Sequence, residues 1–356
     1  MGRNNFSIII NEENIINNYN YIKDLSKKEI ISVIKSNAYS HGTKESIIAL
    51  SKAGCKYFAV AREEEVMEIL NLGLDLKNIT ILVLETLSNL NLLKEHDNVE
   101  MVINSIEELE EFIDLKLDFS KLHLKLDFGF GRNGIYSSQI IKARELIVNN
   151  NLFFKGITTH MFDSTSEEIK SIQMNFLKTI EFLGNNRFSM IHSENSATTL
   201  TNGHLGPTHV RCGISLLGLL DPGINNSNIK RSWRLLGSVY HIGNVENLSY
   251  IGYENIKNLN FDGYKFVAKL KIGYGDGFSK SNTNIICHIN NKPFKIVHVS
   301  MDTTFVAIDE TVSIGDIVEI YKDMDYSNEY LNMPHYEYIT LINKRIERKL
   351  LKNPNF

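Results

Sequence analysis

Residues 57–85 read YFAVAREEEVMEILNLGLDLKNITILVLE, and this stretch shows the unit from which much of the chain is built. A short apolar run is followed by EEEVMEILNLG, whose apolar residues recur at spacings of three and four, as on one face of a helix. Gly73 then marks a helix stop, and a second apolar run begins at Ile79. The pattern predicts strand, helix and strand, which is typical of a parallel βαβ unit.

The same alternation extends on both sides of this stretch, through the first two thirds of the chain. The strand-like runs are IISVIK (30–35), YFAVA (57–61), ITILVLE (79–85), EMVIN (100–104), LHLKLD (122–127), GITTH (156–160), FSMIHS (188–193) and THVRCG (208–213). Eight such repeats over roughly two hundred residues favour a closed (β/α)8 TIM barrel. An open doubly wound sheet with fewer strands is the alternative that this pattern leaves open.

The sequence pattern changes after about residue 225. Strand-like runs such as LLGSVYHIG, FVAKLKIGYG and KIVHVS are now separated by turns of Gly, Asn and Asp, which predicts a mostly β domain. The stretch DPGINNSN, beginning at Asp221, is the natural linker. We therefore expect a barrel domain over residues 8–225 and a mostly β domain over 226–356, with an opening strand in residues 1–7 joining the second domain.

Composition excludes several classes of protein. The 356 residues contain 38 Lys and Arg against 42 Asp and Glu, a net charge of −4, so no nucleic-acid partner is predicted. A hydrophobic fraction of 43% with 22% charged residues fits a globular protein with a large core rather than a disordered chain. The apolar runs are far shorter than the roughly 20 residues of a membrane helix, so no membrane partner is expected.

The N-terminus and the cysteines predict a cytoplasmic location. The opening sequence MGRNNFSIIINEEN lacks the longer apolar core and the cleavage site of a secretory signal. Cys55, Cys212 and Cys287 lie far apart and form neither a disulfide framework nor a CxxC motif. We expect ordinary reduced thiols and no metal site.

Polar residues follow several of the predicted strands, where a TIM barrel carries its active site. Lys35 ends the first strand, and its apolar surroundings would lower the pKa of its ammonium group, as in lysines that form Schiff bases. A solvated lysine in a loop is the plain alternative. Arg132 lies between Gly131 and Gly134 after the fifth strand, where it suits a carboxylate, and His160 ends the sixth.

An anion-binding site is predicted after the last two strands. Ser196 precedes a short helix, and Gly213 and Ile214 follow a strand where backbone N–H groups are available. Tyr39 adds a hydroxyl that could reach a phosphate. A simple helix cap at Ser196 and a structural ion pair at Arg211 are the alternatives.

Two motifs of the β domain carry more polar groups than a hairpin needs. They are IGYGDGFSKS (272–281), which contains Tyr274, and HVSMDTTFV (298–306), which contains Met301 and Asp302. Ordinary turns and strand starts would also explain them.

Eight sequence blocks in a fixed order together resemble those of alanine racemases, the fold-type-III enzymes that use pyridoxal 5'-phosphate (PLP). The blocks are VIKSNAYSHG (33–42), YFAVAREEEV (57–66), LHLKLDFGFGRNGI (122–135), GITTHMF (156–162), IHSENSATT (191–199), VRCGISLLG (210–218), IGYGDGF (272–278) and VSMDTTFVAID (299–309). The resemblance implies a barrel followed by a β domain, a head-to-tail homodimer with shared active sites, and a small amino acid as substrate.

The resemblance also implies roles for single residues. Lys35 would bind the cofactor covalently, and Tyr274 of the partner subunit would be the opposing base, so that two bases invert the substrate from opposite faces. Arg211 would face the pyridine nitrogen of the cofactor and keep it unprotonated. The remaining roles are phosphate binding by Tyr39, Ser196, Gly213 and Ile214; a place beside the ring for His160; and substrate binding by Arg132 and by Met301 and Asp302 from the other subunit. Lys125 matches a lysine that braces the arginine and is carbamylated in many members of the family.

Departures from the family pattern concern the substrate. The usual Ala and Gly of the lysine block are Ser36 and Ser40 here, and INKRIER (342–348) replaces a tyrosine followed by an arginine-proline pattern. Asn343 or Lys344 thus stands where many members carry a tyrosine near the substrate. This resembles the serine/alanine racemase domains of vancomycin-resistance systems, so alanine is the first expected substrate and serine the second.

Other functions remain open at this point. A PLP-binding homeostasis protein has a similar barrel and no catalysis, but it lacks a second domain. A fold-type-III decarboxylase has both domains but would show different glycine-rich blocks and a longer chain. A racemase of a basic amino acid is a further alternative.

Overall fold

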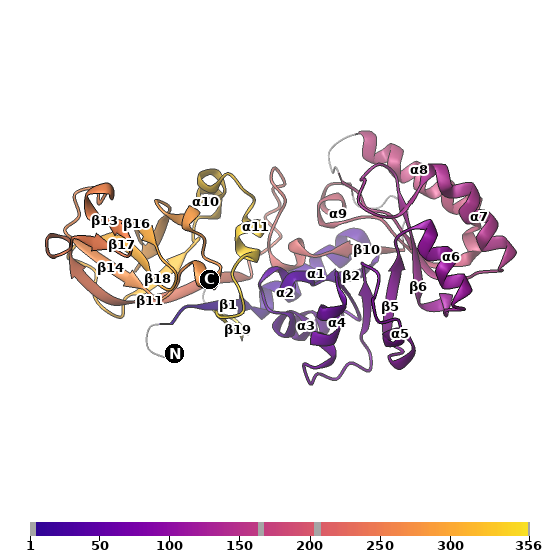
Figure 1. Cartoon of the computed structure of the whole chain (residues 1–356), viewed down its shortest axis with the longest axis horizontal. Coiled ribbons are helices and arrows are strands. Elements are labelled where there is room, and N and C mark those ends of the chain that lie inside the picture. Colours follow the sequence, from indigo (N-terminus) through magenta and orange to yellow (C-terminus); the bar gives the residue numbers. More distant parts are fainter. Residues whose placement is uncertain (1–4, 163–166, 203–207, 355–356) are drawn as a thin grey trace. The chain divides into compact units, whose positions relative to one another are not determined.

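The computed structural model describes residues 5–162, 167–202 and 208–354 and divides into two compact units (Figure 1). The barrel unit contains Asn14–Ala38 and Ser46–Lys230. The β unit contains the described residues up to Glu13, the short segment Tyr39–Glu45, and the chain from Arg231 onward. Each unit is described by itself below.

Within the described residues, eight parallel strands close the barrel unit into a ring, in the order β2-β3-β4-β5-β6-β8-β9-β10 and back to β2. β5 pairs with β6 and β10 with β2, so the ring has no open edge and the open-sheet alternative is wrong. The predicted barrel is confirmed. The strands are β2 (Glu29–Val33), β3 (Tyr57–Val60), β4 (Thr80–Val83), β5 (Val99–Ile103), β6 (Leu122–Asp127), β8 (Phe154–Thr158), β9 (Phe188–His192) and β10 (His209–Cys212), each within or overlapping a predicted run.

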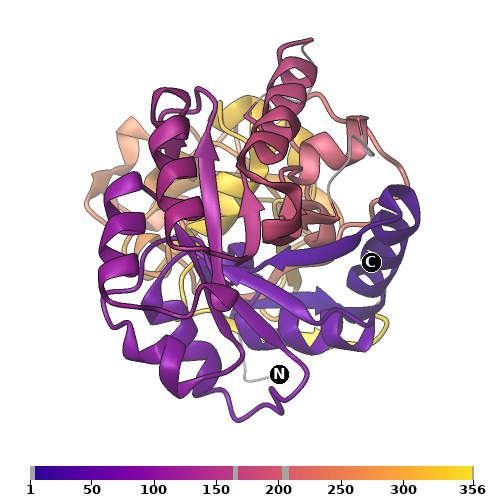
Figure 2. The ribbon, with the colours of Figure 1, turned by 90° about the vertical axis from the view of Figure 1, so that its right-hand side faces the viewer.

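Helices lie outside the strands (Figure 2). In α6, the Ser105 hydroxyl accepts a hydrogen bond from Glu108 N at 3.1 Å, and the Glu108 carboxylate accepts one from Asn104 N at 2.7 Å. These bonds satisfy N–H groups at the helix start, as the Ser-x-x-Glu spacing predicts. The helices are α1 (Glu12–Ser26), α2 (Lys35–Tyr39), α3 (Thr43–Lys52), α4 (Glu63–Leu70), α5 (Asn91–Glu95), α6 (Ile106–Asp114), α7 (Ile140–Asn149), α8 (Glu167–Leu183) and α9 (Ser196–Asn202). No helix among the described residues is both long enough and apolar enough to cross a lipid bilayer.

The interior of the barrel has an apolar and a polar side. Side chains alternate along a strand, so His123 and Lys125 of β6 point into the ring, whereas Leu122, Leu124 and Leu126 point outward and are not part of its interior. The polar side also holds buried charged and imidazole groups of β5, β9 and β10. The apolar side is one packed cluster of Ile31, Val33, Ala59, Leu82, Val102 and Met190.

The β unit is built around a long strand, β11 (Trp233–Asn244). In the described chain, β11 closes a ring of antiparallel strands with β14 (Phe266–Leu270), β17 (Thr304–Ile308), β16 (Lys292–Val299), β15 (Ile286–Ile289) and β18 (Ile317–Ile320). β1 (Ser7–Asn11) pairs antiparallel with β11 and parallel with β19 (Glu347–Leu351). The short elements of this unit are β12 (Tyr250–Ile251), β13 (Glu254–Asn255), α10 (Met324–Leu331) and α11 (His335–Thr340), whereas β7 (Ile135–Tyr136) belongs to the barrel unit and pairs with β6.

The observed limits of the units differ from the predicted ranges at three places. Residues 8–11 were expected in the barrel, but β1 is buried along its whole length between β11 and β19 and belongs to the β unit. Along the chain, the barrel unit ends at Lys230 and the β unit continues from Arg231, whereas the predicted boundary lies between residues 225 and 226. The segment Tyr39–Glu45 also belongs to the β unit, because Ser40 is bound there by Arg348. Residues 1–4 and 355–356 of the predicted ranges lie outside the described residues.

Truncating the apolar cluster tests the barrel packing. Ile31 is fully buried there, so Ile31→Ala should lower the free energy of unfolding by about 2–5 kcal/mol through lost burial and a cavity. Urea unfolding measures the change. The control is Ile141→Ala on α7, where the side chain is 67% exposed and the effect should stay within about 0.5 kcal/mol. Equal effects of the two changes would contradict the described packing.

Candidate active site

Lys35 lies two residues beyond β2 and begins α2, at the C-terminal rim of the barrel. Its side chain is partly buried, and loss of hydration lowers its pKa below the ordinary lysine value, with the nearby Arg132 charge as the second cause. Glu65 and Glu85 act in the opposite direction. The lowered pKa that the apolar strand predicts is therefore present.

The backbone after Lys35 turns in the left-handed sense. Ser36, Asn37 and Ala38 have φ of 53°, 54° and 50°, and Tyr39 and Ser40 continue with 49° and 69°. For L-residues this conformation costs roughly 1–2 kcal/mol per residue. No residue of SNAYS (36–40) is a glycine, so the sequence gives no clear signal of this left-handed turn.

The end of this turn is held by hydrogen bonds within the β unit. The Ser40 hydroxyl donates to Ile342 O at 2.6 Å, and Arg348 donates to Ser40 O at 3.1 Å and to the Ser40 hydroxyl at 2.6 Å. Tyr39, predicted to bind phosphate, is partly buried beside this anchor and accepts a bond from the His41 ring at its carbonyl.

His160 lies two residues beyond β8 and is surrounded by positive charge. Burial is the main cause that lowers its pKa to about 3, and the charges of Arg211, Arg132, Lys125 and Lys35 add to the effect. The imidazole is therefore neutral at physiological pH, beside four cationic side chains. Its ring also meets Phe130 edge-on, with the ring centroids 4.8 Å apart. This rim favours an anionic ligand.

Arg211 is 7% exposed and lies across the ends of β8 and β9. Its Nη1 donates to the Thr158 hydroxyl at 2.7 Å and to His192 O at 2.6 Å, and its Nη2 donates to Thr159 O at 2.8 Å and Ser193 O at 3.3 Å. Burial lowers its pKa to about 10, so it stays charged at neutral pH. These partners are neutral oxygen atoms, which argues against the structural ion pair.

The glycine-rich loop after β6 is organised by Asp127. Its carboxylate accepts hydrogen bonds from the backbone of Gly129 at 2.8 Å, Gly131 at 2.9 Å and Arg132 at 3.2 Å. Gly134 has φ of 126°, and a Cβ there would lie 3.0 Å from Asp127 N, so a larger residue would not fit. Asp127 is not among the predicted site residues, although an acidic residue before a glycine-rich loop was an available signal.

Lys125, in β6 before this loop, lies within electrostatic reach of Arg132. Lys125 donates to Asn133, which in turn donates to Asn104 at 2.8 Å. Burial, followed by the charges of Arg132 and Arg211, lowers the pKa of Lys125 to about 7. Arg132 is exposed, lies over the Phe130 ring at 4.7 Å, and lines a cavity of about 480 Å³ that also contains Glu85, Glu107, Glu108 and Tyr136.

Ser196 and the segment after β10 form a cluster of small donors. The Ser196 hydroxyl accepts from Gly213 N at 3.1 Å and from Ser215 N at 3.5 Å, and the Ser215 hydroxyl lies 3.0 Å away. Ile214 is buried beside them. Ser215 was missed, although it follows Gly213 and Ile214 in the same motif.

In the β unit, backbone hydrogen bonds join the turn that contains Tyr274 to the segment that contains Met301. Tyr274 N donates to Ser300 O at 3.0 Å, and Gly275 N donates to Met301 O at 2.9 Å. A Cβ on Gly277, which has φ of 87°, would lie 1.9 Å from Leu341 O. Tyr274 is 38% exposed and Met301 53% exposed, so both side chains lie at the surface of this unit.

The segment INKRIER (342–348) makes hydrogen bonds and ion pairs with the turn that contains Tyr274. Asn343 donates from its side chain to Gly275 O and from its backbone to Asp276 O, both at 2.9 Å. Arg345 pairs with Asp276 at 3.2 Å and with Asp302 at 2.7 Å. Of the two residues considered in place of the family tyrosine, Asn343 is thus in direct contact with the turn.

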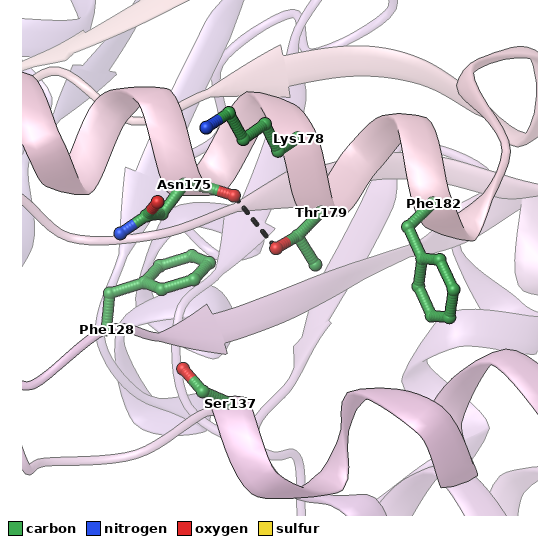
Figure 3. A pocket seen from close by; sticks show the side chains of 6 residues that line it. All are labelled: Phe128, Ser137, Asn175, Lys178, Thr179 and Phe182. Carbon is green, nitrogen blue, oxygen red and sulfur yellow. Dashed lines mark hydrogen bonds between the residues drawn. The ribbon is translucent and has the colours of Figure 1, made fainter.

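Another cavity, of about 290 Å³, lies away from the predicted residues (Figure 3). Phe128, Ser137, Asn175, Lys178, Thr179 and Phe182 line it, and most come from α8. No predicted site residue is among them, so this cavity does not contribute to the candidate active site.

These features define a class: two-domain proteins whose (β/α)8 barrel carries a partly buried lysine and an anion-binding rim, followed by a mostly β domain. The chain belongs to the alanine racemase family. Residues 10–221 match the family described as "Alanine racemase, N-terminal domain", and residues 233–350 match "Alanine racemase, C-terminal domain". The resemblance inferred from the sequence blocks is confirmed.

Individual proteins agree with this assignment. The chain is 29% identical to an alanine racemase of Clostridium novyi over 97% of this chain and 95% of that protein. The structure of an alanine racemase from Bacillus anthracis with bound L-Ala-P is similar with a TM-score of 0.83 and 26% identity, covering 99% and 96% of the two chains. One from Bartonella henselae with covalently bound pyridoxal phosphate has the same fold, with a TM-score of 0.82, 21% identity and coverage of 98% and 99%.

Removing the Asp127 carboxylate tests how the Arg132 loop is held. Asp127→Ala leaves three backbone N–H groups without their partner, so the free energy of unfolding should fall by about 1–3 kcal/mol. Asp127→Asn keeps one acceptor oxygen and should lose less. Urea unfolding of both variants measures the difference, and an unchanged Asp127→Ala protein would show that the loop does not depend on this carboxylate.

Proposed function

We propose that the protein is a PLP-dependent racemase that interconverts L- and D-alanine. The observation that carries this proposal is the rim of the barrel, where four basic side chains, Lys35 among them, act electrostatically on the neutral His160. A phosphate, a phenolic oxygen and a substrate carboxylate are the anions that such a rim suits. The relatives in the alanine racemase family support the choice of reaction.

The functional groups of the residues described here are chemically suited to the parts of PLP. Lys35 supplies an amine with a lowered pKa, which suits an aldehyde. The Ser196 hydroxyl and the amides of Gly213 and Ser215 converge at one place, which suits a phosphate. Arg211 is a buried cation that donates hydrogen bonds and accepts none, which suits an unprotonated ring nitrogen. Tyr39 and Ile214 are proposed to complete the phosphate site. When bound, PLP makes the Cα–H of an attached amino acid acidic by delocalising its electrons.

One base then removes the Cα proton of the substrate, and a second base returns a proton to the opposite face of Cα. Lys35 Nζ accepts it on one face, because its lowered pKa makes the neutral amine available at lower pH than for an exposed lysine. Tyr274 of the partner subunit returns a proton through its hydroxyl on the other face. Arg132 binds the substrate carboxylate, while Met301 and Asp302 of the partner subunit border the substrate.

We propose a homodimer with shared active sites. The support is the exposure of Tyr274 and Met301 on the β unit, where a second subunit can reach them. Because a two-fold symmetric dimer repeats every contact, each subunit would complete the site of the other. A cytoplasmic location is also proposed, on the support of three buried cysteines without disulfides.

Serine is the alternative substrate, and Asn343 is the observation that favours it. Asn343 is smaller than the tyrosine common in the family and contacts the backbone of the Tyr274 turn. The alternative functions are less well supported. A PLP carrier has no counterpart of the β unit, and the match to both alanine racemase domains disfavours a decarboxylase.

Replacing Lys35 tests the covalent attachment. Lys35→Ala should remove the visible absorption of the bound cofactor and reduce alanine racemisation at least a thousandfold, because it removes both attachment point and base. After borohydride reduction, mass spectrometry of the wild type should find the cofactor on Lys35. Full activity of Lys35→Ala would disprove the mechanism.

Mixing two inactive variants tests the shared site. Lys35→Ala and Tyr274→Phe subunits, exchanged to equilibrium, should give hybrid dimers with one intact site, so about a quarter of wild-type activity returns. Each variant incubated alone under the same exchange conditions is the control. If activity stays absent after exchange that native mass spectrometry confirms, Tyr274 does not act across subunits.

Replacing Asn343 tests the substrate range. In Asn343→Tyr the ratio of kcat/KM for serine to that for alanine should fall about tenfold, because a bulkier residue narrows the space beside the substrate. Polarimetry or coupled assays with both amino acids measure the ratio. The matched control is Lys344→Tyr at the exposed neighbouring position, which should leave the ratio unchanged.

A further inference from the structure

A chain of hydrogen bonds between buried side chains runs along the polar side of the barrel interior and ends at Arg211. Glu100 Oε2 lies 2.9 Å from His123 Nε2, His123 Nδ1 lies 2.9 Å from His192 Nε2, and His192 Nδ1 lies 3.0 Å from Arg211 Nη1. The four side chains come from β5, β6, β9 and β10, and each residue is at most 7% exposed. At the other end, Lys155 pairs with Glu100 Oε1 at 3.1 Å.

The two ends of the chain fix the protons between them. Arg211 Nη1 has two protons and shares them among Thr158 Oγ1, His192 O and His192 Nδ1. Because a guanidinium only donates, His192 Nδ1 accepts at this contact and the proton of His192 is on Nε2. That proton points to His123 Nδ1, which therefore accepts, and the proton of His123 is on Nε2 and donates to Glu100. Burial lowers the pKa of both imidazoles and keeps them neutral, so each ring carries one N–H donor and one acceptor nitrogen.

A glycine in a neighbouring strand of the barrel leaves room for the His123 ring of this chain. Gly156 of β8 lies against the His123 ring, and a Cβ at this position would be 2.2 Å from His123 Nδ1. The two imidazoles meet edge-on, with ring centroids 5.0 Å apart. Glycine is therefore required here by the close approach of a ring rather than by backbone conformation.

We propose that Glu100, His123 and His192 are positioning residues for Arg211. They orient its guanidinium and compensate its charge through a directional chain that ends in a carboxylate. Loss of the His192 acceptor leaves Nη1 with two oxygen partners and removes the link to Glu100. This inference rests on the proposed function in one respect, because it takes PLP as the group that Arg211 would face. The hydrogen-bonded chain itself involves only protein side chains and does not depend on that proposal.

Histidine tautomers in the cofactor-free protein test the chain directly. Nitrogen-15 NMR of labelled histidine should find His123 and His192 both neutral and both protonated on Nε2, with assignment by comparison with His123→Gln. A charged imidazole at either position, or a proton on Nδ1 of His192, would overturn the proposal. This measurement uses the wild type and does not depend on the folding of a variant.

Two substitutions of His123 connect the chain to the cofactor. His123→Leu removes the acceptor for His192, so the PLP dissociation constant should rise about tenfold, which corresponds to about 1.4 kcal/mol. His123→Gln can accept from His192 and donate to Glu100 through its amide and should stay within about twofold of the wild type. Met190→Leu, in the apolar cluster of the same barrel, is the matched control and should also stay within about twofold.

The outcomes separate this inference from the proposed function. If the wild type bound no PLP while the Nε2 tautomers were found, the proposed function would fail and the chain would stand. If PLP bound normally and His123→Leu changed neither the tautomer of His192 nor the dissociation constant, the chain would fail and the proposed function would stand.

Discussion

The closure of eight parallel strands into one ring is the constraint on which the rest of the barrel depends. It brings strand ends that are far apart in sequence to one rim, and so it places Lys35, Lys125, Arg132 and Arg211 within electrostatic reach of His160. Such a concentration of positive charge is unfavourable by itself, because like charges repel and three of these groups, Lys35, Lys125 and Arg211, are at least partly buried. Burial is the main cause of the neutral state of His160 and of the lowered pKa values of Lys35 and Lys125, and the neighbouring positive charges add to it.

The fold was predictable because the signals that determine it are local and repeated. The apolar runs, the helical spacing and the caps, such as Ser105 with Glu108, all report on neighbours in sequence. The limits of the units were less predictable, because β1 joins strands from the far end of the chain. That pairing depends on tertiary contacts, which no window of sequence contains.

The candidate site was predictable where residue type alone carries chemistry, as for Lys35 and Arg211, and less so where geometry does. Asp127 and Ser215 act through hydrogen bonds to backbone groups that the fold brings near. The buried chain from Glu100 to Arg211 joins four strands, and only the closed ring makes them neighbours. The roles assigned to Tyr39, Tyr274, Met301 and Asp302 stay predictions until a cofactor and a second subunit are seen with them.

The left-handed turn after Lys35 bears on how a newly made chain matures. Five successive residues in this conformation cost roughly 5–10 kcal/mol, about the net stability of a whole domain, so the turn cannot persist without its anchors. Ser40 is held by Ile342 and Arg348, which the ribosome adds some three hundred residues later. The end of the turn that follows Lys35 is thus anchored only when synthesis has almost ended. An unfinished polypeptide that lacks Ile342 and Arg348 would have to adopt another backbone conformation over residues 36–40.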